Sequence, residues 1–208
     1  ERILSHLKPG SSEPVSLAKC LNRVPARDLA AATDLPLFDN SSMDGFAIRA
    51  ADGADASPAS PRSLRVIADI PAGTSPKVPI AKGEAARIMT GAQLPEGADA
   101  VIPVEDTDFE NRDSGSPPPD LVKIFKPANP GDSIRYRGMD IRAGDVIFQK
   151  GQPLKSQDLG LLAMLGFGSV EVYRKPRVAL FSSGDELLAV DAPLEPGKIR
   201  DSNSIMLA

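Results

Sequence analysis

Residues 39–49 read D-N-S-S-M-D-G-F-A-I-R, and the interpretation of the whole fold depends on this short stretch. Two carboxylates, one amide and two hydroxyls stand before a glycine, and Phe46 and Ile48 follow at the spacing of a strand. A structural turn explains the stretch, because its amide or hydroxyls can bond the local backbone and Gly45 can adopt a positive φ. A functional site explains it equally well.

The residues upstream predict a helix and then an extended segment. Apolar residues recur with helical spacing at Val15, Leu17, Ala18 and Leu21. Glu13 and Pro14 suit the first turn of that helix. Residues 27–40 are expected to be extended, because Pro36 disfavours helical backbone at the residue before it.

The residues downstream are typical of short strands. Runs rich in β-branched residues occupy 64–68, 84–89, 100–104 and 121–125, and Gly, Pro, Asn and Asp separate them. Together with a first strand anchored by Phe46 and Ile48, they predict a small barrel or sandwich. Residues 114–120, S-G-S-P-P-P-D, predict a flexible surface loop.

A further strand is predicted at 141–148, followed by a helix at 156–165 that Ser156 caps and Gly166 ends. The β-rich block thus lies between two stretches that each carry a helix. We therefore expect residues 1–43 and 140–175 to form one elongated split domain, and residues 44–139 to be a β-rich, barrel-like insertion.

The last part of the chain, residues 176–208, has the pattern of an α/β unit. Residues 178–181 form a continuous apolar run, as expected of a strand buried in a parallel sheet. The segment S-S-G-D-E at 182–186 predicts a turn and a helix start, and a second helix is expected from 201–203. Since a sheet needs several such units, we expect the α/β domain to be truncated here.

Composition narrows the possible functions. The chain has 208 residues, a net charge of −4 and only 4% aromatic residues, which argues against a basic nucleic-acid surface. It has no apolar run near the ~18 residues of a membrane span and no signal-peptide pattern at residues 1–8, so a cytoplasmic protein without membrane contact is expected. The single Cys20 excludes an internal disulfide and predicts a buried thiol, and the single His6 predicts a surface side chain.

Three further clusters contain residues suited to chemistry. The segment 182–186 follows an expected strand, where helix N-H groups bind anions, although Asp185 and Glu186 could simply complement a helix dipole. In the segment 134–142, I-R-Y-R-G-M-D-I-R, two arginines at strand spacing could grip an oxyanion, with Asp140 orienting them or holding a cation. A surface ion-pair network is the alternative.

The third cluster, residues 87–106, carries turn signals at Thr90-Gly91 and around Gly97. Turn chemistry accounts for these glycines without any function. The acidic pair Glu105-Asp106 follows a strand, where edge solubility is a sufficient explanation.

Four ordered strings make the combination more specific: D-N-S-S-M-D-G-F-A-I-R, R-I-M-T-G-A-x-x-P-x-G-A-D-A-V, I-R-x-R-G-x-D-I and S-S-G-D-E-L. In this order they closely resemble the molybdopterin molybdenumtransferases, the family that includes the E domain of gephyrin. The resemblance extends from the N-terminal region to the last residue.

The resemblance implies a multidomain α+β protein, in which a split domain with a β-rich insertion precedes a three-layer molybdopterin-binding α/β domain. It implies a homodimer whose cleft lies between the α/β domain of one protomer and the inserted domain of the other. The implied reaction is magnesium-dependent: adenylyl-molybdopterin and molybdate give molybdenum cofactor and AMP. The molybdopterin adenylyltransferase and molybdoenzyme-maturation proteins are the implied protein partners.

Roles carry over by motif. The resemblance places catalytic roles on Asp44, Thr90, Asp140 and Glu186. It places substrate binding on Arg135, Arg137, Ser182, Ser183, Gly184, Asp185, Asp201, Ser202 and Asn203. The predicted ligands of Mg²⁺ are Asp44, Asp140 and Glu186. Asp39 is assigned to the turn.

Two features depart from the family. Its members often have Thr before the glycine of S-S-G-D-E-L, and the expected truncation removes later site residues, so this stretch alone is expected to be inactive. The alternative functions are a scaffold of the same fold and a protein that binds molybdate alone. Carboxylates at three of the four motif positions, Asp44, Asp140 and Glu186, favour catalysis over scaffolding.

Overall fold

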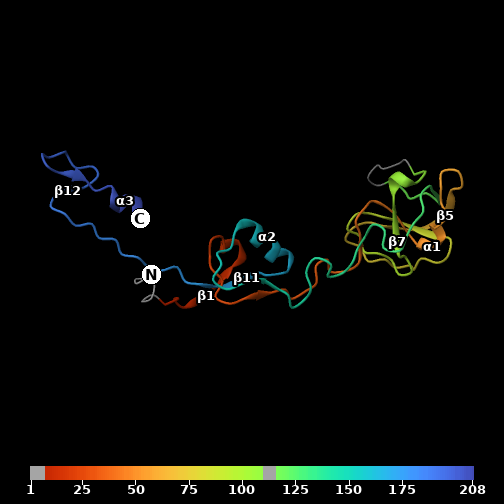
Figure 1. The fold of residues 1–208 in the computed structure, drawn as a ribbon, viewed down its shortest axis with the longest axis horizontal. Coiled ribbons are helices and arrows are strands. Elements are labelled where there is room, and N and C mark those ends of the chain that lie inside the picture. The colour runs from red at the N-terminus through yellow and green to blue at the C-terminus, as the bar shows by residue number, and fades with distance from the viewer. Residues whose placement is uncertain (1–7, 110–115) are drawn as a thin grey trace.

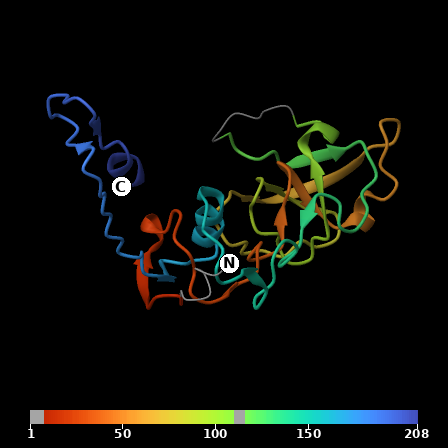
Figure 2. The same ribbon diagram turned by 60° about the vertical axis from the view of Figure 1, so that its left-hand side comes forward.

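The computed structural model describes residues 8–109 and 116–208 of the chain. It is elongated, with a β-rich unit at one end and the C-terminal residues reaching away at the other end (Figure 1; Figure 2). A smaller unit lies in the middle, around β1 (Ser12–Ser16), β11 (Ser169–Tyr173) and α2 (Ser156–Met164). The prediction for His6 falls outside the described residues, as do residues 114–115 of the predicted loop.

The β-rich unit is built on a five-stranded sheet in the order β7-β4-β6-β5-β8. Its strands are β4 (Gly45–Ile48), β5 (Arg62–Ile70), β6 (Glu84–Ile88), β7 (Ala100–Pro103) and β8 (Leu121–Ile124). A short helix, α1 (Ala50–Gly53), follows β4, and a 3-10 helix, η3 (Val104–Asp106), follows β7. The predicted strands of this block are confirmed, and the sheet curls into half a barrel.

Strand β4 lies between β7 and β6 and is buried on both faces. Phe46 and Ile48 pack into one core cluster, with Leu64, Ile102, Val122 and Ile124 among their neighbours. Ala47 points to the other face, into a second cluster with Ile70, Ile88 and Val101 among its members. Because alternate strand residues point to opposite faces, this four-residue strand serves both cores.

The middle unit combines residues that precede the β-rich unit in the sequence with residues that follow it. Strand β1 (Ser12–Ser16) pairs antiparallel with β11 (Ser169–Tyr173), and β2 (Leu29–Ala30) pairs with β10 (Val146–Phe148). A third core cluster collects buried side chains from these stretches and from the helix α2: Cys20, Leu29, Leu154, Leu162, Val170 and Val172. This packing is what the predicted split domain requires, and its exact boundaries stay a prediction.

The helix predicted around 15–21 is wrong. Residues Ser12–Ser16 form β1, and only Leu17–Lys19 make a single 3-10 turn, η2. The ladder to β11, together with an ion pair of 2.7 Å between Arg23 Nη2 and Glu13 Oε1, holds the segment extended. Pairing with a strand about 150 residues later thus overrides the local helical spacing.

Cys20 is fully buried in the third cluster, as predicted. Its thiol donates to the carbonyl oxygens of Val15 and Ser16 at 3.4 and 3.3 Å. Burial raises the pKa of the Cys20 thiol above its ordinary value, because the thiolate would lose its solvation.

The helix predicted at 156–165 is confirmed as α2 (Ser156–Met164). Ser156 is its first residue rather than its cap: the Asp158 carboxylate accepts the Lys155 amide at 2.8 Å. At the other end, Gly166 has φ +82, and Phe167 N donates to Leu162 O at 2.9 Å. This is the left-handed glycine termination that the sequence predicts.

Two extended segments connect the middle unit to the β-rich unit, and we call them the connecting ribbon (residues 31–41 and 134–145). Strand β3 (Asn40–Ser41) pairs with β9 (Ile134–Arg135), and Leu35 forms an isolated bridge with Ile141. The extended course predicted for 27–40 is confirmed in part: residues 29–30, 35 and 40 pair with other segments, and bends at 32–33 and 36–38 interrupt it. The strand predicted at 141–148 is confirmed only for its last part, β10, because residues 142–145 form a turn.

The buried strand predicted at 178–181 is wrong. No strand in the described part of the chain pairs with these residues, and Val178 and Phe181 are 77% and 89% exposed. A strand without a partner leaves its backbone hydrogen-bonding groups to solvent and has no ladder to hold it. The predicted helix start after Gly184 is also wrong, because a turn there leads into β12 (Leu187–Leu188), which pairs in parallel with β13 (Ile199–Arg200). The last predicted helix is confirmed as α3 (Asn203–Leu207).

Candidate functional site

Asp44 and Thr90 come together at one end of the central sheet. Asp44 immediately precedes β4, and Thr90 follows β6 by two residues. Antiparallel pairing places Gly45 opposite Ile88, so the two motifs meet although 46 positions separate them in sequence. The backbone N-H and the hydroxyl of Thr90 both donate to Asp44 Oδ1, each at 2.7 Å.

These two bonds lower the pKa of the Asp44 carboxyl below its ordinary value, with the Thr90 hydroxyl as the larger cause and the Thr90 amide as the second. The carboxylate is therefore ionised, and one of its oxygens is held in place. The side chain remains solvent-accessible, and its other oxygen, Oδ2, has no hydrogen-bond partner among residues 8–109 and 116–208. Asp44 thus presents a fixed negative acceptor to the outside.

Gly45 does not adopt a positive φ, so the turn conformation considered for it is wrong. Its glycine identity has a different cause, the close packing of β4 against β7. A Cβ at this position would lie 2.9 Å from the carbonyl carbon of Ile102 and would overlap the attached oxygen. The absence of a side chain at Gly45 lets β4, and Asp44 before it, approach the neighbouring strand.

Arg135 and Arg137 do not share the face of one strand, contrary to the prediction. Strand β9 ends at Arg135, and Arg137 lies in the turn after it. The Arg137 Nε donates to Asp34 Oδ2 at 2.5 Å, and its backbone N-H donates to Asp39 Oδ1 at 2.7 Å. Arg137 therefore belongs to the ion-pair alternative, and Asp39 accepts a bond that shapes the connecting ribbon.

Asp34 was not among the predicted residues, although it is the partner of Arg137. Its Oδ1 also accepts the Ala143 amide at 2.9 Å, and that amide, followed by Arg137, lowers the pKa of the Asp34 carboxyl. Arg135 and Asp140 are exposed, and neither side chain pairs with another described residue. Their predicted roles in substrate binding and catalysis stay predictions.

A second polar group gathers near the C-terminal end. The Ser182 and Ser204 hydroxyls lie 2.7 Å apart, and Asp201 accepts the Ser204 amide at 3.0 Å and the Ser204 hydroxyl. These bonds lower the pKa of the Asp201 carboxyl, with the Ser204 hydroxyl as the largest cause. Ser204 was missed, although its place three residues after Asp201 is the spacing at which a carboxylate reaches a backbone amide.

The remaining predicted binding residues, Ser183, Gly184, Asp185, Ser202 and Asn203, are exposed in the same region. Glu186 is exposed as well and folds back against Gly184, close to where a Cβ of Gly184 would lie. Since no helix begins at Asp185, the anion site expected from helix N-H groups is not formed there. The binding roles of these residues stay predictions.

The predicted magnesium ligands Asp44, Asp140 and Glu186 are not gathered. Within residues 8–109 and 116–208, no group of three His, Cys, Asp or Glu side chains is placed to hold a metal ion. The described residues of this chain alone therefore do not fit a three-ligand magnesium site.

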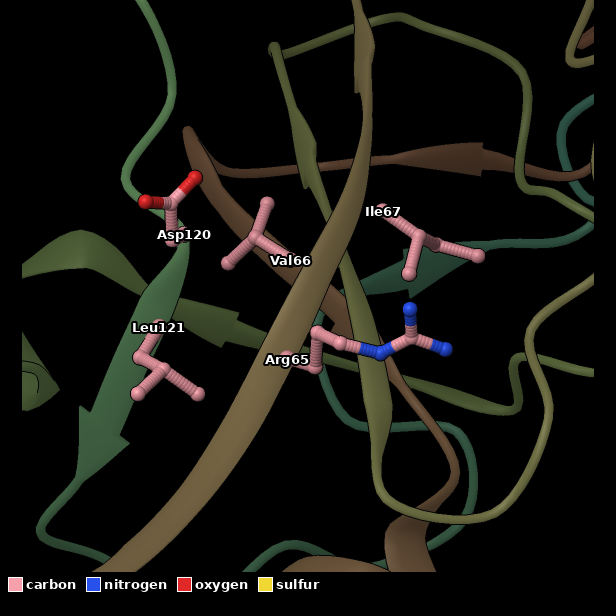
Figure 3. A pocket seen from close by; sticks show the side chains of 5 residues that line it. All are labelled: Arg65, Val66, Ile67, Asp120 and Leu121. Atoms are coloured by element: carbon pink, nitrogen blue, oxygen red, sulfur yellow. The ribbon is translucent and has the colours of Figure 1, made fainter.

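Surface hollows lie elsewhere on the β-rich unit. One of about 580 Å³ is lined by Arg65, Val66, Ile67, Asp120 and Leu121, where β8 begins beside β5 (Figure 3). Another of about 410 Å³ lies between β5 and the loop 71–78. Neither is lined by a predicted site residue.

Among the residues that the structure describes, no helix is both long and apolar enough to cross a membrane.

Glu105 and Asp106 follow strand β7, as predicted, and form part of η3. The Lys126 ammonium lies 2.6 Å from Asp106 Oδ1, and the Asp106 carbonyl accepts the Phe125 amide at 2.9 Å. Asp106 therefore joins β7 to the end of β8, a structural role.

Comparisons with known proteins agree with the fold. The chain is 43% identical over 206 residues to a protein named molybdopterin molybdenumtransferase from Bacillus subtilis, covering 99% of this chain and 47% of that protein. It is 43% identical over 194 residues to molybdopterin molybdenumtransferase 2 of Mycobacterium tuberculosis, covering 93% and 46%. The chain thus spans about half the length of the curated relatives it matches.

Solved structures give the same result. A molybdopterin biosynthesis moeA protein from Pyrococcus horikoshii OT3 is 36% identical with a TM-score of 0.84, over 96% of this chain and 52% of that one. The family model described as MoeA N-terminal region (domain I and II) matches residues 1–166. The chain therefore belongs to the MoeA N-terminal region (domain I and II) family.

Proposed function

We propose that this chain is part of an enzyme of molybdenum cofactor biosynthesis, a molybdopterin molybdenumtransferase. The proposed reaction converts adenylyl-molybdopterin and molybdate to molybdenum cofactor and AMP, with Mg²⁺ required. Support comes from the names of the relatives at about 43% identity and from the four ordered motifs. The proposed setting is a cytoplasmic homodimer that receives its substrate from a molybdopterin adenylyltransferase and serves molybdoenzyme-maturation proteins.

The observation that carries the proposal is the pair formed by Asp44 and Thr90. Two motifs that the resemblance associates with activity are joined by two bonds of 2.7 Å at one end of the sheet. A turn does not require a carboxylate that has one oxygen anchored and the other free. A site for a polar reaction benefits from such a carboxylate, because a charge that is already oriented needs little reorganisation when the substrate binds.

The chemistry of Asp44 follows from its surroundings. Its Oδ1 already accepts two hydrogen bonds from Thr90, so we expect Oδ2 to be the atom that contacts the substrate. An ionised carboxylate accepts hydrogen bonds and opposes cations, and pterin rings carry N-H donors. Thr90 uses both of its donors on Asp44, so we assign it to orienting the carboxylate rather than to contacting substrate. Magnesium enters the proposal through the resemblance alone.

The test measures AMP release by the full-length enzyme supplied with adenylyl-molybdopterin, molybdate and Mg²⁺. We expect Asp44→Ala to lower kcat about a hundredfold, the scale of losing one preorganised polar group. Asp55→Ala is the matched control, because Asp55 lies in the same unit and, among the described residues, its side chain makes an exposed ion pair with Arg62 and no other bond.

Omitting Mg²⁺ should abolish AMP release, because the proposed reaction requires it. Glu186→Ala is carried in parallel, since Glu186 belongs to the last motif. Wild-type turnover in both Asp44→Ala and Glu186→Ala would show that the site is assigned wrongly.

A further inference from the structure

The loop that carries Asp44 is pinned at both of its ends. Before it, Ser41 N donates to Ala92 O at 3.1 Å, and Ser41 O accepts the Gly91 amide at 2.8 Å. After it, Gly45 enters the sheet between β6 and β7. Residues 42–44 must therefore span the short distance from the turn at residues 90–92 to the start of β4.

The hydroxyl of Ser41 shapes this crossing. Ser41 is fully buried, at 0% exposure. Its Oγ donates to the Met43 carbonyl at 2.5 Å and accepts the Met43 amide at 3.2 Å. The Met43 carbonyl belongs to the peptide unit that joins Met43 to Asp44, and a peptide unit is planar. A hydrogen bond that holds this carbonyl therefore also fixes the orientation of the Asp44 amide and the position of the Asp44 Cα.

The neighbouring Ser42 provides an internal contrast. It is half-buried, its amide donates to Ser133 O at 2.9 Å, and its hydroxyl bonds to no other described residue. Two adjacent serines thus differ in one respect that matters here, because only the Ser41 hydroxyl is used to hold the loop. Ordinary turn formation does not require that hydroxyl to be buried in the sheet end.

From this geometry we propose that Ser41 is a positioning residue for Asp44. Its hydroxyl fixes the Met43–Asp44 peptide so that Asp44 Oδ1 meets the amide and hydroxyl of Thr90. Any consequence for catalysis rests on the proposed function, whereas the placement of Asp44 does not. The two can therefore be tested separately.

The first test follows hydrogen exchange of the Thr90 amide, which donates to Asp44 Oδ1. We expect Ser41→Ala to accelerate its exchange about fivefold to tenfold, the scale of the net loss when the hydroxyl's two bonds to Met43 are removed. Ser42→Ala should leave the rate unchanged. The Val66 amide, which donates to Asp120 O in the same sheet, reports any general destabilisation. Unchanged Thr90 exchange in Ser41→Ala would overturn the inference, as would equal acceleration at Val66.

Where Ser41→Ala does not give folded protein, Ser41→Cys replaces it, because a thiol has similar size but bonds more weakly. An intermediate acceleration at Thr90 is then expected, and wild-type exchange would overturn the inference.

The second test measures turnover in the full-length enzyme. Ser41→Ala should lower kcat about fivefold to tenfold with KM changed less than about twofold, and Ser41→Cys should recover part of the loss. Faster Thr90 exchange with unchanged kcat would leave Ser41 as the residue that places Asp44 and would count against the proposed role of Asp44. A rise in KM alone would contradict a positioning role in turnover.

Discussion

Single residues at the start of β4 decide how close its neighbours can come. Gly45 lies between Ile88 on β6 and Pro103 on β7, and a Cβ would sit 3.1 Å from the Pro103 Cα and overlap the Ile102 carbonyl oxygen. The backbone of two strands cannot move apart at one point without losing ladder bonds on both sides. Gly45 is thus required by space and not by backbone conformation.

We expect Gly45→Ala to lower the free energy of unfolding of the β-rich unit by about 1–3 kcal/mol, the usual cost of overpacking. The matched control is Gly160→Ala in α2, where a Cβ would meet no atom within 4 Å beyond the chain neighbours and the backbone of its own helix. There alanine should raise stability by up to ~1 kcal/mol, because it forms helix more readily than glycine. Urea unfolding of both variants measures whether the free energy of unfolding falls in Gly45→Ala and rises in Gly160→Ala. A wild-type midpoint for Gly45→Ala would contradict the close packing of β4.

At the scale of elements, the connecting ribbon relies on carboxylates that cross from one segment to the other. Asp34 accepts bonds from Arg137 and Ala143, and Asp39 accepts the Arg137 amide. Backbone bonds between Leu35 and Ile141 complete the ribbon. The arginine first expected at the substrate therefore links the two segments of the ribbon.

The Asp34 pKa makes the ribbon sensitive to acid. The folded pKa lies below the ordinary value of 3.8, so the stabilisation is complete above that value and is lost as pH falls through the folded pKa. We expect the Ala143 amide proton resonance to move over this acid range in NMR spectra. The Gly144 amide, which donates to the Ala31 carbonyl at 2.8 Å, is the reference.

In Asp34→Asn the acid-dependent movement of the Ala143 resonance should disappear, because the neutral amide does not titrate. If Ala143 still moved in that variant, a group other than Asp34 would control the ribbon.

At the scale of the whole molecule, the β-rich unit and the middle unit have separate cores. Among the residues that the structure describes, the two clusters on the faces of the five-stranded sheet share no buried residue with the cluster around Cys20 and Leu162. Within residues 8–109 and 116–208, the connecting ribbon is what joins the two units along the long axis (Figure 1). Separate cores with so narrow a connection are expected to unfold separately.

Calorimetry of the chain should therefore resolve two transitions. Leu162→Ala should lower the transition of the middle unit, and Ile124→Ala that of the β-rich unit, each by about 2–5 kcal/mol of local stability. Both side chains are fully buried, which makes the two variants matched controls for each other. One transition that both variants shift equally would show that the units unfold together.

Local patterns in the sequence were sufficient for much of the fold. Short runs of β-branched residues between Gly and Pro predicted the strands of the β-rich unit, and Ser156 to Gly166 predicted α2 within a residue or two. The motif around Asp44 also predicted a site candidate, because a carboxylate beside a glycine at a strand start is a local feature. These features are predictable because residues close together in the sequence cause them.

Tertiary structure decided what depends on distant partners. β1 is a strand because β11 offers it a ladder, whereas residues 178–181 lack a partner in the described chain and stay extended and exposed. Arg137 bonds Asp34, 103 positions away, and the Asp44 carboxylate is anchored by Thr90 rather than by its own turn. Spacing along the chain lists candidate donors and acceptors, but hydrogen bonds and salt bridges act over a few ångströms, so only the folded backbone decides which of them meet.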